Sequence, residues 1–92
     1  MIHELKTHIA PFGAVLSGDK KFEFRRNDRG FRLGDRLLLR ELNHNREDYT
    51  GREIMCFVTY IILGDGDEPS FGVPSGFCVM SIQIEGKGSK TP

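Results

Sequence analysis

The stretch Ala14-Val-Leu-Ser-Gly-Asp-Lys-Lys-Phe-Glu-Phe-Arg-Arg-Asn-Asp-Arg-Gly-Phe-Arg-Leu-Gly-Asp35 contains the end of a helix, a strand and a turn in succession. Residues 21–26 alternate strictly between polar and apolar side chains, which is typical of a half-buried strand. This pattern predicts that Phe22 and Phe24 face the core. It also predicts that the polar face of the strand, with Glu23 and Arg25, is exposed or lines a cleft.

Proline, glycine and runs of apolar residues predict the elements on either side of this strand. Residues 11–17 form a predicted helix, because Pro11 suits the first helical position and Gly18 suits the left-handed residue just past the end. Gly34-Asp35 is a predicted turn, and residues 36–41 a predicted strand with three successive leucines at 37–39. Three adjacent apolar side chains indicate burial on both faces of that strand.

Further predicted strands cover residues 2–6, 52–63 and 77–84, with a hairpin loop at 43–51. Residues 64–76 are rich in Gly, Pro and acidic side chains and are too long for a tight connection, which is typical of a functional or mobile loop. The predicted fold is therefore α+β: a curled sheet or β-barrel of about five strands with one or two short helices.

The chain has 92 residues and 10.4 kDa, which allows one domain, predicted over residues 1–85. Residues 86–92 are rich in Gly, Lys and Ser, and we expect a disordered tail there. The first residues lack the apolar segment of a signal peptide, and the longest largely apolar run, 55–63, is too short to span a membrane. We therefore expect a cytoplasmic protein without a membrane partner.

Cysteine and histidine spacing argues against a metal site. Cys56 and Cys78 form no Cys-x-x-Cys pair, so we expect reduced core residues, with a disulfide as the alternative. The three histidines, at positions 3, 8 and 44, share no ligand spacing and are predicted on the surface or in turns. Asp65-Gly-Asp67-Glu68 lacks the later ligands of a calcium loop and is interpreted as solvated. No metal and no cofactor are expected.

The net charge of zero hides a division along the chain. Residues 20–40 hold eight basic and three acidic side chains, a net +5, whereas residues 41–85 hold two basic and eight acidic ones, a net −6. Either the two segments form separate basic and acidic surfaces, or they pair as neighbouring strands and neutralise each other. Neutrality excludes binding of polyanions over the whole surface, but it leaves room for a local basic cleft.

Gly18, Lys20, Glu23 and Arg25 fill the pattern Gly-x-Lys-x-x-Glu-x-Arg between the predicted helix end and the Gly-Asp turn. In this context the segment resembles the ASCH domain of the PUA-like superfamily. More narrowly, residues 2–84 resemble the small bacterial and phage proteins of the DUF3850 family. The narrower resemblance is carried by His3-Glu-Leu-Lys6, Arg26-Asn-Asp28, Tyr49-Thr-Gly-Arg52-Glu53 and Val58-Thr-Tyr60-Ile.

The resemblance implies a small barrel with a cleft beside the Lys, Glu and Arg strand, in a superfamily associated with RNA binding. We therefore expect an RNA-binding or nucleotide-binding module. The expected ligand contacts are Lys20, Glu23 and Arg25, with Arg26, Arg29 and Arg32 as the electrostatic approach and Phe31, less strongly Tyr49, as a ring for base stacking. The structural alternative is that Glu23 and Arg25 pair with each other or with neighbouring strands, that the arginines are solvated, and that Phe31 covers the core.

Two other functions stay open. A related ASCH-type enzyme class hydrolyses acetylated cytidine with a Lys, a Thr and a Glu. Lys20 matches that Lys, whereas Glu23 stands at the Thr position, so these two residues are the catalytic candidates if the chain is an amidohydrolase of acylated nucleosides. Alternatively, the chain is a bacterial or phage interaction module whose loop 64–76 meets a protein partner.

Overall fold

The computed structural model describes residues 1–66 and 71–86. It contains five strands and one helix, which confirms a small α+β fold. The elements in chain order are β1 (Ile2–Thr7), α1 (Ile9–Ser17), β2 (Phe22–Arg26), β3 (Arg36–Leu42), β4 (Tyr49–Leu63) and β5 (Phe77–Ile84).

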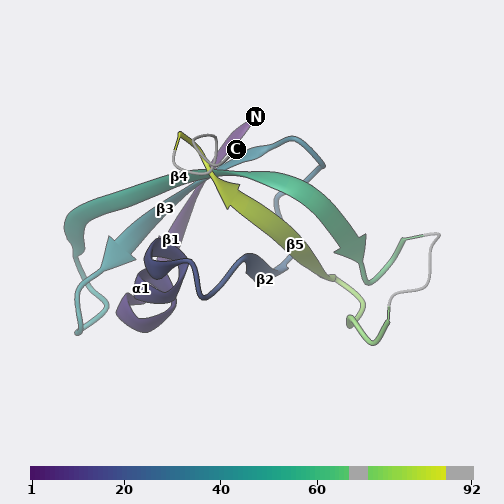
Figure 1. Ribbon diagram of the computed structural model, residues 1–92. Helices are drawn as coiled ribbons and strands as arrows, with labels where there is room; N and C mark the ends of the chain where they lie inside the picture. Colours follow the sequence, from purple (N-terminus) through teal and green to yellow (C-terminus); the bar gives the residue numbers. More distant parts are fainter. Residues whose placement is uncertain (67–70, 87–92) are drawn as a thin grey trace.

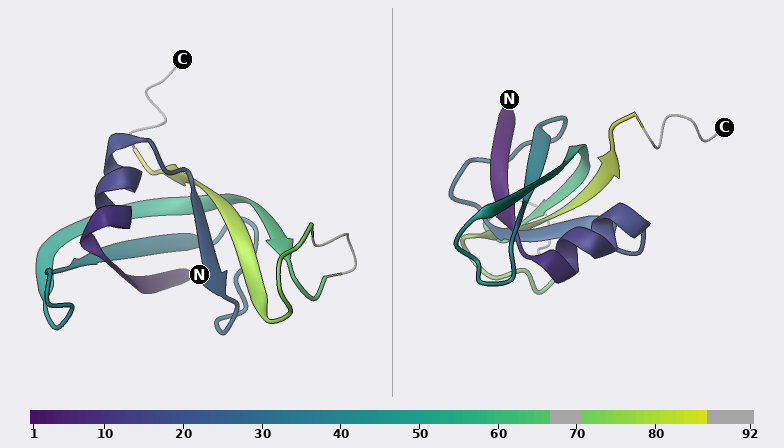
Figure 2. Two further views of the ribbon diagram at one scale, coloured as in Figure 1. Left: turned by 90° about the horizontal axis from the view of Figure 1, so that it is seen from below. Right: turned by 90° about the vertical axis from the view of Figure 1, so that its left-hand side faces the viewer.

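The five strands form a single curled sheet in the order β1-β3-β4-β5-β2. The β1 and β3 strands are parallel, and the other neighbours are antiparallel. The sheet bends into a half-barrel with α1 beneath the arch (Figure 1), and two further views show the same curvature (Figure 2). Because β1 and β2 are its two edges, the curl turns these strands toward the same open side.

The core fills the concave side of the sheet. Phe12 and Val15 of α1 are buried together with inward-facing residues of β3, β4 and β5. Leu37 and Leu39 are fully buried, but Leu38 between them is only half-buried. The expectation that all three leucines are buried was therefore wrong for Leu38, since α1 covers one face of the sheet and leaves the other face without a second layer.

The helix begins earlier than predicted and ends where predicted. It starts at Ile9, so Pro11 is its third residue, a position whose N–H has no partner within a helix in any case. Gly18 has φ +90° and donates its N–H to the carbonyl of Val15. A left-handed residue at this point satisfies a free carbonyl and turns the chain toward β2.

Both cysteines are free and buried, in agreement with the reduced interpretation rather than the disulfide. Burial, together with the negative charge of Glu23, raises the pKa of the Cys56 thiol to about 12, although the positive charge of Lys20 acts in the opposite direction. Burial also raises the pKa of Cys78. A thiol with a raised pKa is a poor nucleophile, so both residues serve packing.

His3 is not the surface residue that its sequence context suggested. It is 7% exposed, its Nε2 lies 2.8 Å from Oδ2 of Asp35, and its ring meets the ring of Phe31 edge-on at 4.8 Å. Burial alone would raise the pKa of Asp35, but hydrogen bonds with His3 and with the N–H of Arg32 hold that pKa below its usual value. The pair ties the start of β1 to the turn before β3.

The structure describes only part of the predicted loops and of the predicted tail. The β4 strand begins at Tyr49, which pairs with Leu42, so the hairpin loop after β3 is shorter than expected. Residues 67–70 of the acidic loop and residues 87–92 of the predicted disordered tail lie outside the described residues. No helix among the described residues is long and apolar enough to cross a membrane.

Candidate ligand-binding cleft

The apolar face of β2 is not the buried one, contrary to the prediction, whereas Glu23 and Arg25 of the polar face line a cleft, one of the two expected placements. Glu23 is 3% exposed, whereas Phe22 and Phe24 are 48% and 50% exposed. Alternation gives the period of a strand but not which face is covered. Glu23 turns toward the concave side because two cations lie there to pair with it, and the phenylalanines take the face that has no covering layer.

A cleft of about 370 Å³ separates β2 from the end of β1 and the start of α1. It is open to solvent, and it lies where the two edges of the curled sheet approach each other. Four cationic side chains and one carboxylate are among its lining residues. The lining consists of Lys6, Thr7, His8, Pro11, Lys20, Phe22, Glu23, Phe24, Arg25 and Arg26.

Both carboxylate oxygens of Glu23 are engaged by cations. Lys20 Nζ lies 2.8 Å from Oε2, and Arg25 Nε lies 2.9 Å from Oε1. Lys20 Nζ also donates to the Phe22 carbonyl at 2.6 Å. The structural alternative for Glu23 and Arg25, pairing with each other, is therefore present. One buried carboxylate holds the two cations in fixed positions at the cleft wall, as charge-assisted hydrogen bonds do.

Arginine side chains also connect the two edges of the sheet. Arg25 Nη2 donates to the Lys6 carbonyl at 3.1 Å and reaches Thr7 Oγ1 at 3.5 Å. Arg29 Nη1 donates to the Glu4 carbonyl at 2.8 Å. These carbonyls belong to an edge strand that pairs only with β3 in the sheet. Side-chain bonds thus link residues 25 and 29 to β1 where no backbone ladder joins the two edges.

The other predicted site residues lie in different places. Arg26 lines the cleft, with its guanidinium carbon 4.9 Å from the centre of the Phe77 ring. Arg32 is exposed and is not among the lining residues. Phe31 is 4% exposed and belongs to the core, so its ring is not available for stacking. Tyr49 is exposed but is not among the lining residues of the cleft, and the guanidinium of Arg40 lies over its ring, 3.7 Å from the ring centre.

Phe31 is drawn inward by its own loop. Its N–H donates to Oδ1 of Asn27 at 2.9 Å, which folds residues 27–31 into a compact turn. Its ring then packs against His3, next to the buried Asp35. The interpretation of Phe31 as a cover of the core holds.

Sequence reasoning missed the wall of the cleft formed by residues 6–11, as well as the exposure of Phe22 and Phe24. Lys6, Thr7 and His8 are distant from β2 in the chain and carry no motif of their own. Their place depends on the parallel pairing of β1 with β3, which brings Lys6 opposite Arg40. The only available signal was Lys6 itself, at the end of the quoted segment His3-Glu-Leu-Lys6.

Part of the divided charge is neutralised between neighbouring strands. Arg36 pairs with Glu85 at 3.1 Å and Arg40 with Glu53 at 2.9 Å. Arg26 of the same basic segment is exposed and lines the cleft, together with Lys6 from outside the segment. Across residues 1–66 and 71–86, no group of three or more His, Cys, Asp or Glu side chains is arranged to hold a metal ion.

Comparison with known proteins places this chain in a family. Residues 2–82 match a family model described as "Domain of unknown function (DUF3850)". The chain belongs to the DUF3850 family. The β1 wall, the Lys20-Glu23-Arg25 cluster and nearly all of β5 fall within the matched residues of this DUF3850 chain.

A relative of the chain occurs in a bacteriophage. The chain is 41% identical over 58 residues to the "Uncharacterized 12.9 kDa protein in GpA 3'region" of Escherichia phage P2. The matched segment covers 63% of this chain and 51% of the phage protein. The DUF3850 chain therefore spans about half the length of this curated relative.

Proposed function

We propose that this DUF3850 chain is a binding module that takes RNA, or a nucleotide-like ligand, in the cleft between β1 and β2. The observation that carries the proposal is the charge of the cleft: four cationic side chains line it against a single carboxylate, and both oxygens of that carboxylate are already paired. An open, locally basic surface on a chain of zero net charge suits a selective phosphate contact.

Lys6 and Arg26 are the side chains with the charge to offer a phosphate. Lys20 and Arg25 are engaged by Glu23, and Arg25 also fastens the edges of the sheet. Lys6 and Arg26 stand on opposite walls of the cleft and are both exposed. A backbone phosphate between them would receive charge from both sides, with the planar fork of Arg26 suited to two oxygens.

We also propose that the half-barrel is of the ASCH type within the PUA-like superfamily. The support is that Gly18, Lys20, Glu23 and Arg25 follow one another at the end of α1 and along β2, and that the Lys, Glu and Arg side chains meet in one cluster beside the cleft. The curled five-stranded sheet is consistent with this assignment.

Titration of a fluorescently labelled twelve-nucleotide oligouridylate, followed by anisotropy at several salt concentrations, tests the binding function. We expect the affinity to fall with salt. For the double variant Lys6→Gln/Arg26→Gln, we expect weaker binding and a salt slope smaller by about 0.7 for each lost phosphate contact with a single strand. Arg46→Gln removes a single charge in the loop after β3 and is the control away from the cleft. Affinity that does not depend on salt, or equal slopes for the double variant and the control, would contradict the proposal.

The amidohydrolase alternative gains no specific support from the cleft. Glu23 has no free carboxylate oxygen, since Lys20 and Arg25 hold both. Among the lining residues, Thr7 carries the side-chain hydroxyl. This hydroxyl donates a hydrogen bond to the Leu5 carbonyl and accepts one from Arg25 Nη2. Catalysis by Lys20 and Glu23 stays a prediction, to be checked by incubating wild type and Lys20→Ala with acetylated cytidine.

The interaction-module alternative likewise rests on the sequence. Within loop 64–76, the carboxylate of Asp65 is used inside the loop, where it accepts bonds from Ser75 and from the N–H of Gly76. Residues 67–70 lie outside the described residues. A protein partner for this loop stays a prediction, and pull-down before and after deletion of the loop tests it.

A further inference from the structure

An aromatic platform lies on the outer side of β2. Phe22 and Phe24 are two residues apart on one strand, so they project to the same side, about 6.8 Å apart along the chain. Each is about half exposed. Phe24 also stacks on Phe77 of β5, with ring centres 5.5 Å apart and planes at 25°. Large rings left in water on a small domain forgo burial that would stabilise the fold, and such patches commonly mark binding sites.

The platform extends across the sheet toward β4. Phe22 pairs with Ser81, and Ser81 pairs with Tyr60, so these residues lie on the same side of the sheet. Tyr60 is 65% exposed. The exposed rings of β2 therefore belong to a wider exposed surface that carries a further ring, Tyr60.

Cations accompany the rings. Lys20 Nζ lies 4.7 Å from the centre of the Phe22 ring, and the guanidinium of Arg26 lies over Phe77 at 4.9 Å. Phe22 and Phe24 also line the mouth of the basic cleft. A ligand that fits this surface presents flat π faces and regularly spaced negative charges together. Unpaired nucleotides do so, because each carries a base and a phosphate.

We propose that Phe22 and Phe24 stack the bases of a single-stranded nucleic acid whose phosphates enter the cleft. The proposal rests on the binding function proposed above and narrows its ligand to strands with unpaired bases. A duplex is excluded as the preferred ligand, since its bases are already stacked and paired. The stacking role expected for the buried Phe31 thus passes to two rings that the alternation of residues 21–26 had assigned to the core.

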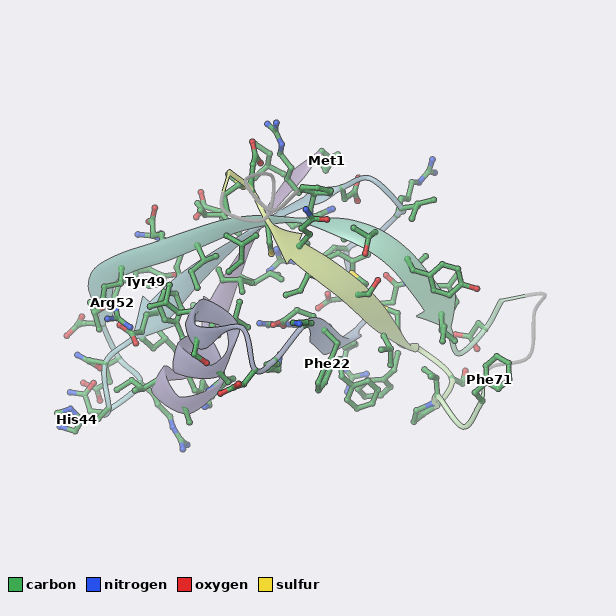
Figure 3. The ribbon with its side chains drawn as sticks, viewed as in Figure 1. Met1, Phe22, His44, Tyr49, Arg52 and Phe71 are labelled. Atoms are coloured by element: carbon green, nitrogen blue, oxygen red, sulfur yellow. The ribbon has the colours of Figure 1, made fainter. Side chains whose placement is uncertain are left out.

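Phe22→Leu and Phe24→Leu test the platform, because leucine keeps an apolar side chain and removes the ring. The matched control is Tyr49→Leu, which removes another exposed ring with a cation over it, well apart from Phe22 (Figure 3). Three probes are compared by competition against the labelled oligouridylate: the unlabelled oligouridylate, a duplex of equal length, and inorganic polyphosphate, which has charge but no bases. Thermal melting confirms that each variant folds.

For either phenylalanine variant we expect the affinity for the single strand to fall by about 5- to 150-fold, the range measured for loss of one stacked base. We expect the affinity for polyphosphate to stay unchanged, the wild type to bind the duplex more weakly than the single strand, and Tyr49→Leu to behave as wild type. Upfield shifts of the Phe22 and Phe24 ring protons on addition of the oligouridylate would provide direct support.

Three results would overturn the stacking inference while leaving the binding function intact: undiminished affinity of both variants for the single strand, equal loss for the single strand and polyphosphate, or duplex affinity matching that of the single strand. Sedimentation analysis tests whether a second copy of the chain, rather than a nucleic acid, covers the exposed rings. If the wild type self-associates and Phe22→Leu prevents this without weakening oligouridylate binding, the surface is a protein interface and the inference is wrong. If the wild type binds neither the oligouridylate nor polyphosphate, the binding function itself fails.

Discussion

Arg25 donates a hydrogen bond from Nη2 to the main-chain carbonyl of Lys6 at 3.1 Å, and this bond joins β2 to β1 across the open side of the half-barrel. The same guanidinium pairs through Nε with Glu23. One side chain therefore both closes the sheet and neutralises a buried carboxylate. Arg25 also lines the cleft, so a variant of this residue changes the stability of the fold as well as the surface offered to a ligand.

Arg25→Leu should destabilise the fold. It leaves one oxygen of the buried Glu23 without its partner and removes the link to β1, and an unsatisfied buried acceptor costs about 1–3 kcal/mol. Urea denaturation measures the change in the free energy of unfolding. Arg46→Gln, at an exposed loop position, should stay within about 0.5 kcal/mol of wild type. If the two variants unfold at the same urea concentration, Arg25 does not fasten the sheet.

The burial of Phe31 and the exposure of Phe22 predict opposite costs of truncation. Phe31→Ala should lose about 3–5 kcal/mol, because it empties a core position. Phe22→Ala should lose less than about 1.5 kcal/mol, since half of its ring is already in water. Thermal or urea unfolding of both variants gives the comparison. A larger loss for Phe22→Ala would mean that β2 buries the other face.

The lowered pKa of Asp35 predicts a loss of stability in acid. A carboxyl whose pKa is lower in the folded than in the unfolded state stabilises the fold when the pH is above the pKa of the unfolded state, about 3.9. This contribution disappears as the pH falls through the pKa of the folded state. Asp35→Asn should therefore be less stable than wild type at pH 7, with a difference that shrinks below pH 4. Urea midpoints measured between pH 2 and pH 7 test this.

Asp48→Asn, at an exposed position in the loop after β3, is the control for that series. Its difference from wild type should be small and nearly independent of pH. A gap between Asp35→Asn and wild type that stays constant from pH 7 to pH 2 would show that the Asp35 carboxylate does not contribute through its charge.

The thiols should be unreactive in the folded protein. Cys56 is fully buried and its pKa is raised to about 12, so almost none of it is thiolate at pH 8. Cys78 is also fully buried with a raised pKa. Reaction with a thiol-specific disulfide reagent at pH 8 should proceed for both residues in urea and be suppressed in buffer. Rapid labelling of one thiol without urea would show that its surroundings open readily.

Much of the fold could be predicted because it depends on local signals. The end of α1 at Gly18 and the strand 77–84 agree with the expectation, and the four other strands each differ from it by three residues or fewer at one end. The cluster of Lys20, Glu23 and Arg25 was predicted as a unit, since these residues are close in the chain. Lys6, Thr7 and His8 were not, because only long-range strand pairing brings them to β2.

The sequence by itself determined the period of each strand, the breaks between elements and the local excess of positive charge, since all three depend on neighbouring residues. Only the tertiary structure decided which face of β2 is buried. The same alternation fits either orientation, and the outcome depends on Lys20 and Arg25 pairing with Glu23 while the outer face of the sheet has no covering layer. The curl that brings β1 to β2 then forms the cleft beside this alternating strand, with both its polar residues and its phenylalanines among the lining.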